Sequence, residues 1–304
     1  MSVTTTKAVP LLERLARGEI IVSDGATGTY LQEHGLEPGG CPEEFNVSHP
    51  DVVQGMAASY LAAGSQMVLT NSFGGSKFML KKYGYPDKVR EFNRVAAELA
   101  RRAATQDQYV VGSVGPTGEF LEPLGEVSEA EMYDAFLEQI TALEEGGADA
   151  VVIETMTAVE EAALAIKAAK DGTILPVMAT MTFDKGPRGY FTMMGVTPEL
   201  GVNRLREAGA DIVGSNCGNG IDRMIEIATM MRQATDGHLL IHSNAGIPAI
   251  QSGKIVYPES PAYMVPRFQK LVDLGIDIVG GCCGTGPGHI SAIVEALGGR
   301  SEPA

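Results

Sequence analysis

One stretch decides the fold class of this chain: Gly147-Ala-Asp-Ala-Val-Val-Ile-Glu-Thr-Met-Thr-Ala-Val-Glu-Glu-Ala-Ala-Leu-Ala-Ile-Lys-Ala-Ala-Lys170. Near its start lies a short apolar run, Ala150–Glu154, which is rich in Val and Ile and does not alternate strictly with polar residues. Such runs are typical of parallel strands that are covered on both faces. The amphipathic segment Val159–Lys170 follows and has the length of a helix. The stretch therefore predicts one strand followed by one helix.

The same strand-then-helix unit recurs along the chain. The predicted strands are Ile20–Ser23, Met67–Asn71, Tyr109–Gly112, Ala150–Glu154, Pro176–Thr182, Ile212–Ser215, Leu239–Ser243 and Ile278–Gly281. The predicted helices are Asp51–Ala63, Asp87–Ala104, Glu129–Glu145, Val159–Lys170, Pro198–Ala208, Ile221–Thr235, Pro261–Leu274 and Pro287–Leu297.

Eight such units predict an α/β fold of the (β/α)₈ (TIM) barrel type. A doubly wound parallel sheet is the alternative. No linker or shift in composition divides the chain, so we expect a single domain over residues 1–304, with its core at about residues 20–297.

The composition narrows the classes of function. The chain has 304 residues, of which 38 are acidic and 23 are basic, so its formal net charge is −15. This acidity disfavours nucleic acids and anionic membrane surfaces as partners, because both attract Lys- and Arg-rich faces. The sequence has no run of roughly 18 apolar residues that could span a membrane. The N-terminal region also lacks the apolar stretch of a secretory signal, and we expect a soluble, cytoplasmic protein.

Three of the four cysteines follow predicted strands. Cys217 comes shortly after Ile212–Ser215, and Cys282 and Cys283 come directly after Ile278–Gly281. In a barrel, both strand ends lie at the C-terminal rim, where barrel enzymes have their active sites. Three thiolates suit Zn²⁺, and three protein ligands leave its fourth position open, as in catalytic zinc sites. The alternative is that these cysteines are buried, unreactive thiols.

The adjacent pair sets a geometric condition on this site. Neighbouring side chains on a strand point to opposite faces, so Cys282 and Cys283 can share a metal only if the backbone bends there. Glycines before the pair and Gly284 after it permit such a bend. The fourth cysteine, Cys41, lies in a Gly-Gly-Cys-Pro loop, and we expect it not to be a ligand.

Two acidic residues also stand at strand ends. Asp24 begins Asp24-Gly-Ala-Thr-Gly-Thr29, and Glu154 ends Val151-Val-Ile-Glu154. A carboxylate in such a place is costly to desolvate without a partner, which could be the ammonium group of a ligand or a hydrogen bond from a neighbouring loop. The turn Gly25–Thr29 offers backbone N–H groups that could hold a carboxylate. Beside a zinc ion with an open position, these features predict a pocket for an amino acid that bears a thiol.

Six short elements make the sequence recognisable. They are Asp24-Gly-Ala-Thr-Gly-Thr29, Leu69-Thr-Asn-Ser-Phe-Gly74, Gly115-Pro-Thr-Gly118, Ser215-Asn-Cys-Gly218, Asn244-Ala-Gly-Ile-Pro248 and Gly280-Gly-Cys-Cys-Gly-Thr285. They occur in the order seen in zinc-dependent homocysteine S-methyltransferases, and the chain resembles that family from about Ile20 to Leu297. The resemblance implies a (β/α)₈ fold. It also implies the roles of seven residues: Cys217, Cys282 and Cys283 bind zinc, Asp24 and Glu154 bind the homocysteine ammonium group, and the backbone around Gly25 and Ala26 takes its carboxylate.

The resemblance further implies an enzyme that activates homocysteine as a zinc-bound thiolate and methylates it to methionine. The stretch Gly115–Gly125 looks most like the homocysteine-binding module of cobalamin-dependent methionine synthase. A methylcobamide donor would be carried on a separate corrinoid protein, because nothing in the chain resembles a cobalamin-binding domain. Betaine and S-methylmethionine are alternative donors, although betaine-using relatives rely on Trp and other aromatic residues and this chain has no Trp. A non-catalytic zinc or thiol protein is the remaining alternative.

Overall fold

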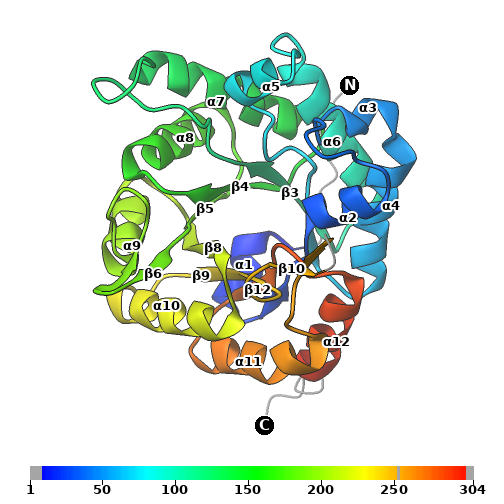
Figure 1. Ribbon diagram of the computed structural model, residues 1–304, viewed down its shortest axis with the longest axis vertical. Coiled ribbons are helices and arrows are strands. Elements are labelled where there is room, and N and C mark those ends of the chain that lie inside the picture. Colours follow the sequence, from blue (N-terminus) through cyan, green and yellow to red (C-terminus); the bar gives the residue numbers. More distant parts are fainter. Residues whose placement is uncertain (1–8, 252–253, 299–304) are drawn as a thin grey trace.

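The eight predicted strands form one sheet that curls into a barrel (Figure 1). The computed structural model describes residues 9–251 and 254–298. The barrel strands are β1 (Ile21–Val22), β2 (Met67–Leu69), β3 (Tyr109–Val114), β4 (Ala150–Met156), β5 (Val177–Met181), β8 (Ile212–Gly220), β9 (Leu239–Asn244) and β12 (Ile278–Gly281). They pair in parallel in the order β1-β12-β9-β8-β5-β4-β3-β2, so consecutive barrel strands are neighbours. This order confirms the (β/α)₈ barrel and excludes the doubly wound sheet.

Two hydrogen bonds join β1 to β2, the strands at the two ends of this order. The backbone N–H of Gln66, just before β2, donates to the carbonyl of Val22 over 2.8 Å. In return, the N–H of Val22 donates to the side-chain Oε1 of Gln66 over 3.0 Å. These bonds close the ring of strands.

Each barrel strand is followed by a helix that covers the outside of the barrel (Figure 1). These helices are α4 (Pro50–Ala62), α6 (Val89–Ala103), α7 (Glu129–Glu145), α8 (Val159–Gly172), α9 (Pro198–Glu207), α10 (Ile221–Ala234), α11 (Pro261–Asp273) and α12 (Pro287–Gly298). All eight predicted helices are therefore confirmed, with ends that differ by a few residues. None of the helices in the described part of the chain is long and apolar enough to cross a membrane.

Several short elements were not predicted from the sequence. They are α1 (Leu11–Ala16), α2 (Thr27–Glu33), α3 (Phe45–Ser48), α5 (Lys77–Lys82), the hairpin of β6 (Asp184–Gly186) with β7 (Gly189–Phe191), and the hairpin of β10 (Ala249–Gln251) with β11 (Lys254–Val256). α1 precedes the first strand, and its Leu11 and Leu15 pack with apolar side chains from the barrel strands. The other elements lie in the connections that leave the C-terminal ends of the strands, on the side of the barrel where the predicted site residues stand.

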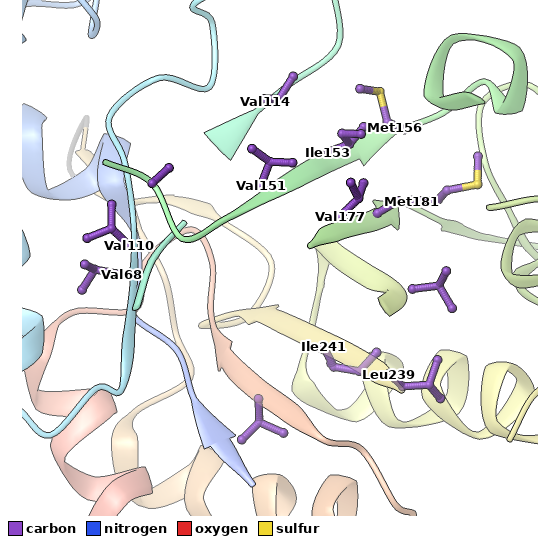
Figure 2. Close-up of a cluster of buried hydrophobic side chains, with 14 of the residues drawn as sticks. Val68, Val110, Val114, Val151, Ile153, Met156, Val177, Met181, Leu239 and Ile241 are labelled. Atoms are coloured by element: carbon purple, nitrogen blue, oxygen red, sulfur yellow. The ribbon is translucent and has the colours of Figure 1, made fainter. Parts of the chain in front are cut away.

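Apolar side chains occupy both faces of the barrel strands. One set, which includes Met67, Met178 and Ile278, forms a cluster with residues of α1. Alternate residues on the same strands, such as Val68 and Val177, belong to a larger cluster that packs against the helices (Figure 2). This two-sided burial explains why the strands lack a strict apolar–polar alternation.

A side-chain hydrogen bond repeats at the N-terminal ends of the strands. An Asp or Gln before one strand accepts the backbone N–H at the start of the preceding strand. The four pairs are Gln66 with Val22, Asp149 with Val110, Asp211 with Val177 and Asp277 with Leu239, at N···O distances of 3.0, 2.7, 2.7 and 2.8 Å. Each acceptor stands two residues after a glycine with positive φ that follows a helix. The same Gly-x-Asp or Gly-x-Gln sequence thus follows a helix and fixes the neighbouring strand.

Candidate active site

Three cysteine sulfurs meet at the C-terminal rim of the barrel. Cys217 lies in β8, Cys282 and Cys283 follow β12, and β9 lies between these two strands in the sheet. The three Sγ atoms all lie within 4.8 Å of one another, and Cys217 Sγ is 3.9 Å from Cys283 Sγ. The structure therefore brings together the three cysteines that the sequence singled out as metal ligands. We call them the sulfur cluster.

An irregularity in β8 positions the first of these sulfurs. Asn216 pairs with His242 of β9, and the next pair is Gly220 with Asn244. Four steps on β8 therefore span two steps on β9, so the residues between bulge out of the strand. Cys217 lies in this bulge with a φ of +60°. Such a conformation costs a non-glycine residue about 1–3 kcal/mol, and strain of this kind concentrates at functional sites.

The turn after β12 positions the other two sulfurs. The Cys282 N–H donates to the carbonyl of Ser243 over 2.7 Å, which continues the pairing with β9. The hydroxyl of Thr285 donates back to the carbonyl of Cys282 over 2.7 Å. Gly284 takes a φ of +81°, and the chain turns there. The bend predicted from the flanking glycines is confirmed, and it allows Cys282 and Cys283 to approach the same point.

The sulfurs influence one another's protonation. The neighbouring thiols of Cys282 and Cys283 lower the pKa of Cys217 to about 3. The same contact with Cys217 raises the pKa of Cys283 to about 11. Neighbouring thiols therefore stabilise a thiolate within the cluster, and its negative charge favours the approach of a cation.

The geometry and chemistry of the cluster fit a zinc ion. Ligand sulfurs at about 2.3 Å from a tetrahedral zinc lie about 3.8 Å apart. The 3.9 Å between the sulfurs of Cys217 and Cys283 is close to this separation. Thiolate sulfur is also a ligand type that zinc prefers. Three protein ligands leave one tetrahedral position for another ligand.

Asp24 is a buried carboxylate just after β1. Asp24 is only 2% exposed. One carboxylate oxygen accepts the backbone N–H of Leu69 over 2.7 Å, and the other accepts the hydroxyl of Ser23 over 3.1 Å. Burial raises the pKa of Asp24 to about 7. No Lys or Arg in the described residues lowers this pKa. The charged form of Asp24 therefore has hydrogen bonds but no counter-ion.

Glu154 is a second buried carboxylate, at the C-terminal end of β4. The hydroxyl of Ser113 donates to its Oε1 over 2.5 Å, and the side-chain amide of Asn216 donates to its Oε2 over 3.0 Å. Burial, with smaller contributions from the charges of Asp24 and Cys217, raises the pKa of Glu154 to about 7. A cation placed between the two acids would stabilise both in their charged forms.

Asn216 links the acidic and sulfur parts of the site, and the sequence analysis missed it. Its Oδ1 accepts the N–H of Thr155 over 2.8 Å and the hydroxyl of Thr180 over 2.7 Å, while its Nδ2 donates to Glu154. Because Asn216 directly precedes Cys217, one residue fixes both Glu154 and the start of the bulge. Its place in the Ser-Asn-Cys-Gly element was the signal that could have identified it.

A cavity of about 440 Å³ opens onto these groups. Glu154 and all three sulfur-cluster residues line it, and the residue after Asp24, Gly25, lines it as well. This volume is in the range of small-molecule sites. No Lys or Arg is among the described residues that line the cavity. No basic side chain among these lining residues therefore neutralises the acidic groups of the cavity.

The turn after Asp24 is held against the cysteine-bearing loop. The N–H of Ala26 donates to the carbonyl of Thr285 over 2.9 Å. The hydroxyl of Tyr60 donates to the carbonyls of Ala26 and Thr285, each over 3.0 Å. A Cβ at Gly25 would lie 2.4 Å from the Thr285 carbonyl oxygen, so the close approach requires glycine. Gly25 and Ala26 both line the cavity, and their expected role in holding a carboxylate stays a prediction.

Two further residues near the site, Cys41 and His242, have strongly shifted pKa values. Cys41 lies outside the sulfur cluster; its sulfur donates to a carboxylate oxygen of Glu43 over 3.5 Å, and burial raises the pKa of Cys41 to about 12. His242 lines the cavity and is buried, and burial lowers its pKa to about 4. We therefore expect Cys41 to be a protonated thiol and His242 to be neutral near pH 7.

Comparison with known proteins identifies the family. The family model for homocysteine S-methyltransferase matches residues 21–297. Methionine synthase from Mycobacterium tuberculosis is 30% identical over 313 residues, which cover 96% of this chain and 26% of that protein. Betaine–homocysteine S-methyltransferase 1 from Rattus norvegicus is 31% identical over 310 residues, which cover 94% of this chain and 74% of that protein. The chain thus spans about a quarter of the methionine synthase and about three quarters of the betaine enzyme.

A solved structure shows the same fold. The metallated form of the homocysteine methyltransferase MmuM from Escherichia coli superimposes with a TM-score of 0.76 at 19% sequence identity. The match covers 94% of this chain and 99% of that chain. At this identity, the likeness supports the barrel architecture alone. The chemistry depends on the residues of the site.

Proposed function

The chain belongs to the homocysteine S-methyltransferase family, and from this we propose that it is a zinc-dependent enzyme that methylates homocysteine to methionine. One observation carries the proposal. The sulfur cluster, which leaves room for a fourth ligand, and the buried carboxylate of Glu154 line the same cavity. A second buried carboxylate, that of Asp24, directly precedes Gly25, which also lines the cavity. These are the groups that would recognise the thiol and the ammonium ends of one small amino acid.

The chain's own residues would bind and orient the substrate. Asp24 and Glu154 would take the ammonium group, whose positive charge would keep both carboxylates ionised. The turn at Gly25 and Ala26 would lie against the substrate carboxylate. With the amino acid held at this end, its sulfur would be directed toward the sulfur cluster, and the methyl donor would approach from the open mouth of the cavity.

Cys217, Cys282 and Cys283 would hold the zinc ion. When bound there, zinc would act as a Lewis acid that favours the thiolate form of a substrate thiol, which is the nucleophilic form. Metal binding requires that the three thiols stay reduced, which fits the cytoplasmic location expected from the sequence.

We propose a methylcobamide on a separate corrinoid protein as the donor. The supporting observation is the likeness to a methionine synthase, which is 30% identical over 313 residues that cover 96% of this chain and 26% of that protein. Betaine or S-methylmethionine is the second candidate. Phe73 and Tyr83 line the cavity, and aromatic faces attract quaternary ammonium and sulfonium groups.

A methyl-transfer assay with a fixed homocysteine concentration and a varied donor tests the proposal. The reduced, zinc-loaded protein is incubated with a methylated corrinoid protein, betaine or S-methylmethionine, and methionine is quantified. Methionine formed with the corrinoid protein alone supports the first donor, and methionine formed with betaine or S-methylmethionine supports the second. If no donor gives methionine, the non-catalytic zinc or thiol protein replaces the enzyme hypothesis.

A further inference from the structure

His242 of β9 points into the interior of the barrel. Leu239 and Ile241 of the same strand belong to the cluster that packs against the helices (Figure 2), whereas Leu240 belongs to the cluster on the opposite face. Because side chains alternate along a strand, His242 lies on the same face as Leu240, two residues nearer the C-terminal rim. His242 is 2% exposed and lines the cavity. Its imidazole therefore stands at the inner end of the cavity.

Polar side chains of neighbouring strands form one interior layer with His242. Ser113, Glu154 and Thr180 each stand two residues after an apolar residue of the inward cluster, and Asn216 pairs directly with His242. Ser113 and Asn216 both donate to the Glu154 carboxylate. The hydroxyl of Thr180 donates to Asn216. The layer is therefore joined by hydrogen bonds up to the residue beside His242.

The imidazole of His242 is not joined to this network. Its Nε2 is buried and has no hydrogen-bond partner within the described residues. Burial alone lowers the pKa of His242 to about 4, so the ring is neutral near pH 7 and one of its nitrogens has a free lone pair. A buried polar group without a partner destabilises the folded state. A ligand in the cavity that donates a hydrogen bond to the ring would remove this cost.

His242 also lies close to Asp24. It pairs with Gly280 of β12, and a Cβ at Gly280 would lie 3.0 Å from His242 Cδ2 and 2.7 Å from Ser23 Cβ. The hydroxyl of Ser23 donates to the Asp24 carboxylate over 3.1 Å. One residue thus separates His242 from Asp24 on one side, as one residue separates it from Glu154 on the other. The imidazole lies between the two buried acids.

We propose that His242 binds the ammonium group of the amino-acid substrate as a third acceptor, beside Asp24 and Glu154. An ammonium group has three N–H donors, of which two carboxylates would accept two and the imidazole the third. The two carboxylates already exceed the single positive charge of the substrate ammonium. A neutral third acceptor adds a hydrogen bond without adding a further negative charge. This inference rests on the proposed function and adds a residue to its ammonium site.

The test compares His242→Leu and His242→Gln with His238→Leu. The leucine at position 242 removes both ring nitrogens, whereas the glutamine keeps a hydrogen-bond acceptor there. His238 directly precedes the same strand, and its Nδ1 hydrogen-bonds to Asp277 over 2.8 Å, so its substitution is a matched control at the other end of the barrel. Calorimetry with the reduced, zinc-loaded proteins measures the affinity for homocysteine and for 4-mercaptobutyrate, which is homocysteine without its amino group.

We expect His242→Leu to weaken homocysteine binding about 10- to 100-fold, because a hydrogen bond to a charged group is lost. Its affinity for 4-mercaptobutyrate and its zinc content should equal those of the wild type, and His242→Gln should recover most of the homocysteine affinity. His238→Leu should bind both ligands as the wild type does. Without substrate, His242→Leu should unfold at a higher denaturant concentration than the wild type, because the unsatisfied nitrogen is gone, whereas His238→Leu should unfold at a lower one.

Failure of this inference and failure of the proposed function give different results. Wild-type homocysteine affinity in His242→Leu, or an equal loss for both ligands, would refute the ammonium contact. A lower unfolding midpoint in His242→Leu than in the wild type would refute its premise, because the ring would then have partners in the free protein. A wild-type protein that binds neither zinc nor homocysteine would refute the proposed function itself, whatever the variants do.

Discussion

Asp24→Asn should make the substrate-free protein more stable and its substrate binding weaker. Burial raises the pKa of Asp24 to about 7 in the folded state, whereas an aspartate in an unfolded chain titrates near about 3.9. The folded state therefore holds this proton more tightly. The resulting stability is fully present below the unfolded pKa and is lost as the pH rises to the folded pKa. An asparagine stays neutral at every pH, so the Asp24→Asn variant does not lose stability in this way as the pH rises.

The size of the effect follows from the two pKa values. A difference of about three units corresponds to about 4 kcal/mol of lost stability above pH 7, and about 1.5 kcal/mol of this loss is already present at pH 5. The advantage of Asp24→Asn over the wild type should therefore grow by about 3 kcal/mol between pH 5 and pH 8. The amide oxygen can still accept the Leu69 N–H that the carboxylate accepts, so the substitution keeps the main hydrogen bond.

The assay is denaturant unfolding of metal-free, reduced protein at pH 5 and pH 8. The difference between variant and wild type cancels the titration of the thiols, and Asp184→Asn, an exposed residue of β6, serves as a control that should behave like the wild type. Homocysteine affinity of the zinc-loaded protein should fall about 10- to 100-fold in Asp24→Asn, because a hydrogen bond to a charged group is lost. The reasoning is refuted if Asp24→Asn is less stable than the wild type at pH 8, or if it binds homocysteine equally well.

Three further substitutions test the metal site, the turn and the frame. Cys282→Ser should lose zinc and activity while the barrel stays folded, as measured by metal content and circular dichroism; full zinc content would contradict the assignment. Gly25→Ala should destabilise the fold by about 1–3 kcal/mol, because its Cβ would meet the Thr285 carbonyl oxygen at 2.4 Å; an unchanged unfolding midpoint would show that the turn can yield. Asp277→Ala should cost about 1–3 kcal/mol by leaving the Leu239 N–H without its side-chain acceptor, with zinc content unchanged; a loss of zinc would show that the two ends of the barrel are coupled.

The barrel could be predicted because its signals are local and repeated. A run such as Ala150–Glu154 followed by a helix at Val159–Lys170 identifies one unit, and eight such units specify the topology. The short elements α2, α3 and α5 could not be predicted in this way. Each has seven residues or fewer, and tertiary packing outweighs intrinsic propensity in helices of this length.

The site could be predicted in part. Cys217, Cys282 and Cys283 stand at strand ends, so the barrel topology alone predicts that they converge, and the structure confirms that they do. The sequence does not reveal that Asn216 holds Glu154 or that the ring of Tyr257 lies against Gly284. Both contacts depend on where the β8 bulge and the connection after β9 place these side chains in space. Such positions follow from register shifts and backbone turns, which have no periodic signal in the sequence.

X-ray absorption at the zinc edge tests the central claim most directly. The reduced, zinc-loaded protein is measured before and after homocysteine is added. We predict three sulfur neighbours at about 2.3 Å before addition and four afterwards. A zinc ion that already has four protein ligands, or a sulfur count that does not change with homocysteine, would contradict the account.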